Sequence, residues 1–254
     1  MCQVEHNVKQ SKPPKSRIQL IDAVRGLAII LMVAYHTGYD LVAFELAPKE
    51  ALYNPLLNTL EPLFAGAFIL LSGVSARYAR DNRLRGLRVL GCALVVSLAA
   101  GAVGVPIPFG ILHCLGCCMV ICGDPAAWLD RIPRRVQPFL FGGLFALFFV
   151  LFRTSVPLFN PVDASFDGIP YLYMFGLRGP GFQSLDYFPL LPWFFLYPLG
   201  AWLGRYIKEG RFPRWFYNCK IPVLPVVGRH TLVIYMLHQP VIYFAVMGLA
   251  AVIK

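Results

Sequence analysis

The sequence contains few charged residues for its length. Only 14% of its 254 residues are Asp, Glu, Lys or Arg, whereas 57% are hydrophobic. A soluble domain of this size needs a charged coat, so the composition excludes an ordinary soluble globular protein. The hydrophobic residues form blocks of roughly 17–25 residues, the length that crosses about 30 Å of hydrocarbon as a helix. The chain is therefore predicted to be a polytopic membrane protein.

Seven apolar blocks are predicted to cross the membrane, which makes the expected fold an all-α transmembrane helix bundle. The predicted spans are 21–44, 57–79, 86–104, 106–122, 136–152, 187–206 and 229–252. The long connection 153–186 is rich in Pro, Gly and aromatic residues. We expect it to fold over the outer face as a lid or substrate platform, or simply to pack on the bundle. The chain is divided into a cytoplasmic basic tail, 1–19, and a transmembrane domain, 20–254.

Acidic residues are scarce, with 13 Asp and Glu against 23 Lys and Arg. The basic excess does not indicate a nucleic-acid partner, because most of it lies in the tail and in the connections on one side of the predicted spans. By the positive-inside rule that side is cytoplasmic, so the N-terminus is expected inside and the C-terminus outside. No small-residue cleavage site follows the first apolar block, which is expected to remain as a signal anchor. The predicted location is a plasma membrane of the bacterial type.

The seven cysteines form no recognisable disulfide framework. Cys114, Cys117, Cys118 and Cys122 fall in the fourth predicted span, where cysteine is interpreted as a small apolar side chain rather than a metal ligand. No metal site is predicted. The chain also shows no internal repeat, which disfavours the common transporter folds.

The stretch "RGLAIILMVAYH" (25–36) places ionisable residues at both ends of an apolar run. Arg25 and His36 lie on one face of a helix, about 16 Å apart, and Asp22 and Asp40 fall on the same face. Such a face must turn toward the bundle interior, where ionisable residues are functional candidates. Alternatively, Asp22 and Arg25 form an interfacial ion pair, and His36 is a buried neutral histidine bonded to a carbonyl. Asp40 could orient the His36 ring and stabilise its cationic form.

Other polar residues fall inside predicted spans. His113 lies at a depth similar to that of His36, and His238 follows Arg229 by nine residues in the last span. Arginines at the inner face could hold an anionic cofactor that enters from the cytoplasm, since guanidinium groups suit phosphates. A neutral histidine could take a proton from an amine or hydroxyl, or accept an acyl group itself.

The opening "RIQLIDAVRGLAIILMVAYH" resembles that of the acyltransferase-3 superfamily of membrane acyltransferases, marked by Arg or Lys, ten residues and His; here these are Arg25 and His36. More closely, the chain is similar to the bacterial family related to the heparan-α-glucosaminide N-acetyltransferase catalytic domain. The further matching motifs are "FILLSGVSARYAR" (68–80), "FGILHCLG" (109–116), "DYFPLLPWF" (186–194) and "GRHTLVIYMLHQP" (228–240). The resemblance covers roughly residues 17–245.

The resemblance implies an enzyme that moves an acetyl or other acyl group from cytoplasmic acyl-CoA, typically acetyl-CoA, to an extracytoplasmic sugar or glycolipid. It also implies that His36 is the catalytic base or acyl relay, and that Arg25 is a donor-binding or structural partner. In the lysosomal relative the proposed catalytic histidine follows this helix, but 45–56 here contains no histidine, so His36 or His113 must fill the role.

The remaining site residues follow from their positions. Ser72, beside Gly73, leaves room for a neighbouring helix or for a pantetheine arm. Asp186 could bind an acceptor amine or hydroxyl at the outer face. The predicted sites are catalytic His36, Asp40 and His113; donor-binding Arg25, Asp22, Ser72, Arg229 and His238; and acceptor-binding Asp186, Tyr187 and Trp193.

Two other classes of function remain open. His36 and His113 at matching depth could clamp a haem iron, which would make the chain an electron-transfer protein. A transporter or scaffold of the same fold is the third reading, with buried charges that carry protons or specify packing. Membrane lipid is an expected partner in every case, and a homo-oligomer is left open.

Overall fold

The computed structural model describes residues 17–51, 55–153, 160–184 and 186–253. Most of the basic tail expected at 1–19 therefore lies outside the described residues. Within the described part the chain is helical and contains no β-strand, only an isolated bridge between Val162 and Arg178. The longer helices are α1 (Gln19–Ala43), α2 (Pro55–Ala76), α3 (Asn82–Ala102), α4 (Ile111–Cys122), α6 (Gln137–Arg153), α8 (Leu196–Lys208) and α11 (Thr231–Ile253). The shorter ones are α5 (Pro125–Trp128), α7 (Leu190–Trp193), α9 (Arg214–Asn218), α10 (Leu224–Arg229), η1 (Lys49–Ala51), η2 (Leu129–Arg131), η3 (Ala164–Phe166) and η4 (Leu172–Phe175).

Several of these helices are long and apolar enough to cross a membrane. They are α1, the segment Thr59–Ala76 of α2, α3 and α11, with a fifth span if α4 and Pro125–Arg131, which meet at a 50° bend, count as one. The expectation of an all-α membrane protein is confirmed, but length and composition support four or five spans rather than seven. α6 has 17 residues, and the predicted span 187–206 is broken because Leu191 has extended backbone angles between two short helical pieces.

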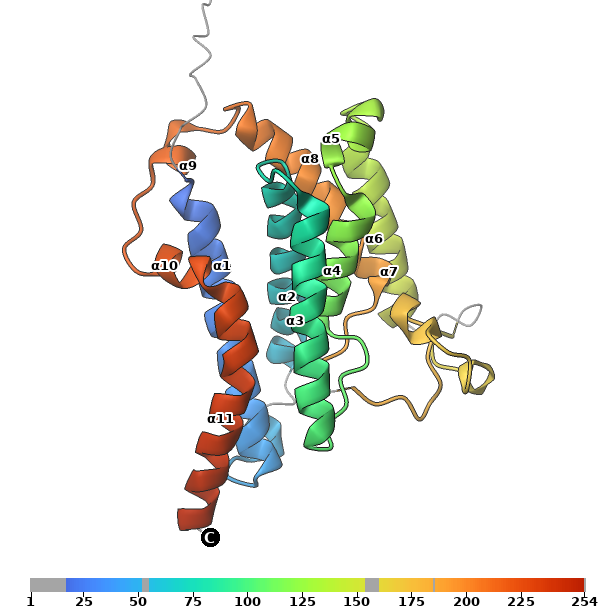
Figure 1. Cartoon of the computed structure of the whole chain (residues 1–254), viewed down its shortest axis with the longest axis vertical. Helices are drawn as coiled ribbons and strands as arrows, with labels where there is room; N and C mark the ends of the chain where they lie inside the picture. The colour runs from blue at the N-terminus through green and yellow to red at the C-terminus, as the bar shows by residue number, and fades with distance from the viewer. Residues whose placement is uncertain (1–16, 52–54, 154–159, 185, 254) are drawn as a thin grey trace, which may run out of the picture.

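The helices alternate in direction along the long axis of the molecule. In Figure 1, α1, α3, α6 and α11 run downward, whereas α2, α4 and α8 run upward. α1 lies beside α10 and α11 on one side of the view, and α3, α4, α6 and α8 lie on the other. α1 also contacts α2, so the two groups form one bundle.

Two glycine contacts bring helix backbones together. A Cβ added at Gly73 would lie 2.0 Å from the Tyr197 carbonyl oxygen, so this position lets α2 approach α8 closely. A Cβ at Gly228 would lie 1.8 Å from the Asp22 carbonyl oxygen, which places α10 directly against the start of α1. The short α10 therefore enters the bundle beside the ionisable end of α1.

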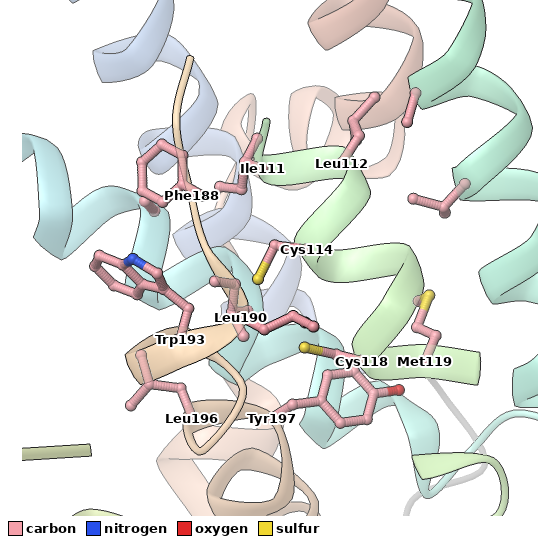
Figure 2. Close-up of a cluster of buried hydrophobic side chains, with 14 of the residues drawn as sticks. Ile111, Leu112, Cys114, Cys118, Met119, Phe188, Leu190, Trp193, Leu196 and Tyr197 are labelled. Atoms are coloured by element: carbon pink, nitrogen blue, oxygen red, sulfur yellow. The ribbon is translucent and has the colours of Figure 1, made fainter. Parts of the chain in front are cut away.

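The main apolar cluster lies between α4 and the segment from Phe188 to Tyr197. Figure 2 shows the side chains of Cys114 and Cys118 pointing into it among Leu190, Trp193 and neighbouring apolar residues. Both cysteines are fully buried, and all the described cysteines are free thiols. This agrees with their interpretation as small apolar side chains.

Candidate active site

An arginine-lined cavity of about 360 Å³ lies among α1, α3, α4 and the start of α11; we call it the inner cavity. Ser72, Met119 and Leu232 contribute to its wall. Five arginines also line it, namely Arg17, Arg25, Arg85, Arg88 and Arg229. Of the five predicted donor-binding residues, Arg25, Arg229 and Ser72 line this cavity, whereas Asp22 and His238 are not among its described lining residues. Arg85 and Arg88 were missed as site residues because arginines near a span end are read as topology signals.

Asp22 holds three of these arginines in place. Its buried carboxylate accepts a hydrogen bond from Arg17 at 3.0 Å, and lies 3.4 Å from Arg25 Nη1 and 3.8 Å from Arg229 Nε. Arg25 also donates to the Leu71 carbonyl at 2.9 Å and to the Ser75 hydroxyl. The Asp22–Arg25 ion pair exists, and it forms part of the cavity wall. One carboxylate does not neutralise five guanidinium groups, so the inner cavity suits a polyanion.

Ser72 and Gly73 serve different neighbours. Ser72 is buried and lines the inner cavity, whereas Gly73 meets the backbone of α8. Gly73 therefore serves helix packing, whereas the assignment of Ser72 to a ligand stays a prediction.

A second cavity of about 150 Å³ adjoins the inner one; we call it the central cavity. The two share four lining residues, which we call the partition: Met32, Phe68, Ile111 and Tyr235. The polar residues that line the central cavity come from distant parts of the chain. They are Tyr35, His36, Glu61, Asp186, Tyr187 and Tyr235.

Asp186 is bonded from two helices. Its Oδ2 accepts the Tyr235 hydroxyl at 2.6 Å and the backbone N–H of Ile111, at the start of α4, at 3.0 Å. Burial raises the pKa of this carboxyl, which lies in the connection before α7, while the bonds from Tyr235 and Ile111 lower it. Asp186 thus joins α4 and α11 at the central cavity.

His36 lies beside His238, with ring centroids 5.1 Å apart. His238 Nδ1 is 2.6 Å from the Tyr235 carbonyl oxygen, so this nitrogen carries the proton and donates. His36 Nδ1 and His238 Nε2 are buried and have no hydrogen-bond partner within the described ranges. Buried polar atoms without partners are uncommon, and at a cavity they are available to a reacting group.

Asp40 was expected to orient the His36 ring, but in the structure its carboxylate bonds to Gln239. Both Asp40 carboxylate oxygens accept from Gln239 Nε2, at 3.1 Å each, so Asp40 joins α1 to α11. No bond between Asp40 and His36 is found in the part of the chain that the structure describes.

His113 lies at the start of α4 and is not among the residues that line the central cavity. Its Nδ1 accepts the N–H of Gly110 at 3.2 Å, which caps the helix, and its ring packs on Phe109. The ring neighbours of His36 are Tyr35 and His238, so the two histidines of the haem hypothesis are not paired with each other. Among the described residues, no group of three or more His, Cys, Asp or Glu is arranged to hold a metal.

A third cavity of about 190 Å³, the outer cavity, shares Glu61, Tyr187 and Phe188 with the central one. Trp193 lines it and also packs against Phe145 and Phe149. Of the predicted acceptor-binding residues, Asp186 and Tyr187 thus face the central cavity and Trp193 the outer one. The three cavities adjoin in the order inner, central, outer.

Glu61 and Tyr235 are functional candidates that the sequence reading missed. Glu61 lies near the start of α2, directly before Pro62, where a carboxylate is commonly read as a helix-start residue. Tyr235 lies in an apolar helix and reads as core. Only the folded arrangement brings both to the central cavity.

The family model described as "Heparan-alpha-glucosaminide N-acetyltransferase, catalytic" matches residues 17–240. No curated protein matches the chain. No solved structure matches it either.

Proposed function

We propose that this chain, which belongs to the heparan-alpha-glucosaminide N-acetyltransferase catalytic family, moves an acetyl or other acyl group across the membrane. The donor would be cytoplasmic acyl-CoA, and the acceptor an amine or hydroxyl of an extracytoplasmic sugar or glycolipid. The observation that carries this proposal is the central cavity, whose histidine and carboxylates lie between an arginine-lined cavity and an outer one.

The proposed topology has seven crossings, with the N-terminus cytoplasmic and the C-terminus outside. The alternating helix directions in Figure 1 support it, with α6 and the broken α7–α8 pair as the two crossings beyond the five apolar ones. Arg77, Arg131 and Arg205 then fall on the cytoplasmic side, as the positive-inside rule requires. The inner cavity would open to the cytoplasm.

The donor would bind in the inner cavity. Arg17, Arg25 and Arg229, already held by Asp22, are preorganised to bind the phosphates of CoA. Ser72 would line the path of the pantetheine arm toward the partition. The thioester would then meet His36 at the central cavity.

The transfer can be direct. The acceptor nitrogen or oxygen attacks the thioester carbonyl carbon, a C–N or C–O bond forms, and the C–S bond breaks. His36 takes the proton that the acceptor loses and returns it to the departing thiolate, so the products are the acylated sugar and free CoA. His238, whose Nδ1 is fixed by the Tyr235 carbonyl, has its ring centroid 5.1 Å from that of His36 and would steady the cationic form of His36.

Labelled acetyl-CoA tests the proposal. Purified protein in nanodiscs, given [¹⁴C]acetyl-CoA and glucosamine, should release CoA and form labelled N-acetylglucosamine. Acetyl-CoA should also protect the protein against heat, by about 2.7 kcal/mol at a hundredfold excess over Kd. Absence of both protection and transfer with amino-sugar and hydroxyl acceptors would reject the function.

A further inference from the structure

The outer cavity combines charges of both signs. Glu61 lies at its junction with the central cavity, and Arg153 and Arg178 contribute to its wall. Aromatic rings complete it, among them Phe149, Tyr187 and Trp193. Flat aromatic faces and a few fixed charges are typical of a small-molecule site.

Arg178 is fixed in position by its surroundings. Its backbone N–H donates to the Pro161 carbonyl at 3.0 Å, and its own carbonyl accepts from Asp163 N–H at 3.1 Å. Its guanidinium carbon lies 5.1 Å from the centre of the Tyr187 ring, whose hydroxyl donates to the Tyr173 carbonyl at 2.7 Å. The ring and the backbone thus orient the guanidinium before any ligand arrives.

Arg178 also keeps its charge available for a ligand. No ion pair joins it to a carboxylate within the described residues, in contrast to Arg25 and Arg77, which pair with Asp22 and Asp130. Arg153, at the end of α6, lies over the Phe149 ring at 5.5 Å and adds positive charge to the same wall. An anionic group is the natural partner of this side of the cavity.

We propose that the outer cavity binds the acceptor and selects one that carries a phosphate or carboxylate beside its reactive amine or hydroxyl. Arg178 receives the anionic group, and Glu61 receives the amine or hydroxyl at the junction with the central cavity. This inference rests on the proposed function and specifies its acceptor. The anion belongs either to a free sugar acid or phosphate or to a lipid headgroup.

Matched sugar probes test the selection. Binding of glucosamine 6-phosphate and of glucosamine is measured by thermal shift on the full chain in phosphatidylcholine nanodiscs, without acetyl-CoA. The wild type should bind the phosphorylated sugar about tenfold more tightly or better, and R178Q should remove that preference while glucosamine affinity stays within about twofold. R178K should retain part of it, because the charge remains but the planar fork is lost.

The control is K49Q, which removes an exposed positive charge at η1, away from the outer cavity. It should leave the preference intact. Equal affinity of the wild type for the two sugars, or equal losses in R178Q and K49Q, would overturn the inference. Ligand-free melting temperatures of the variants establish that each one folds.

Phosphatidylglycerol nanodiscs separate the two sources of the anion. If a lipid headgroup fills the site, these discs weaken sugar-phosphate binding to the wild type and not to R178Q. Equal binding in both kinds of disc assigns the anion to the sugar. Acetyl transfer without a phosphate preference overturns the inference and leaves the function standing. Phosphate-selective binding that R178Q abolishes, without any acetyl transfer, overturns the proposed function and leaves only an anion-binding site at Arg178.

Discussion

The inner and central cavities share a wall but contain different chemistry. Five arginines line the inner cavity, whereas the described lining of the central cavity has one histidine, two carboxylates and three tyrosines. Arginine stays protonated in proteins, so the inner cavity can hold an anion but cannot exchange a proton. His36 and the carboxylates of the central cavity can exchange protons. Under the proposed function, binding and chemistry are thus divided between two neighbouring cavities.

Replacing His36 tests this division most severely. H36A should lower kcat for acetyl transfer by about 100-fold or more, because a positioned base contributes 10²–10⁴-fold. Protection against heat by acetyl-CoA should persist, since the inner cavity is unchanged. The control is H230A, an exposed histidine at the end of α10, which should transfer normally. Full transfer by H36A would reject the assignment.

Tyr235 tests the partition itself. Y235F removes the hydroxyl that bonds to Asp186 and leaves that buried carboxylate with one donor fewer. A lost bond of this kind costs about 1–3 kcal/mol, so kcat should fall about 10- to 100-fold at nearly constant KM for acetyl-CoA. The matched variant Y243F, on the same helix with its ring against Phe44, should behave as wild type. A change in KM alone would mean that the Tyr235 hydroxyl acts in donor binding rather than in catalysis.

Replacing Arg85 tests donor binding in the inner cavity, so the expected effect is on KM rather than on kcat. R85Q should raise the KM for acetyl-CoA about tenfold and leave kcat nearly unchanged, because one charge-assisted bond to a phosphate is lost. R83Q is the matched control on α3: that guanidinium lies near Gly123 and does not line the cavity. Equal KM values for the two variants would place the CoA phosphates elsewhere.

Asp40 should have the smallest effect. D40N weakens its bonds with Gln239 and should reduce the free energy of unfolding by about 1 kcal/mol, while the rate stays within about threefold. A double-mutant cycle with Q239A measures the coupling between α1 and α11. A rate loss as large as that of H36A would return Asp40 to a catalytic role at His36.

The sequence predicted most of the helices because apolar block length determines where a helix can cross lipid. α3 and α6 begin within a few residues of the predicted starts. α4 begins only at Ile111 because Pro106, Pro108 and Gly110 precede it, and the hydropathy of that stretch concealed the delay. Hydropathy does not mark the break at Leu191 either, but Pro189 and Pro192 favour a bend there, because the residue before a proline prefers extended backbone.

The sequence identified site residues only where a polar residue interrupts or borders an apolar run. His36 and Asp186 did so, and both line the central cavity. The partnership of His36 with His238 depends on which helices are neighbours, which span order does not specify. His113 also interrupts an apolar run, but it caps α4, which begins at Ile111 and not at the predicted residue 106.

In the proposed topology, the partition lies between two electrolytes. A membrane potential does about 2.3 kcal/mol of work on each elementary charge per 100 mV, so a continuous water path through the protein would dissipate the ion gradient of the cell. The partition has three apolar members, Met32, Phe68 and Ile111, and its fourth member, Tyr235, directs its hydroxyl to Asp186. Under the proposed function, the acyl arm must fill the space of the partition side chains that it displaces, so that no continuous water path opens during a turnover.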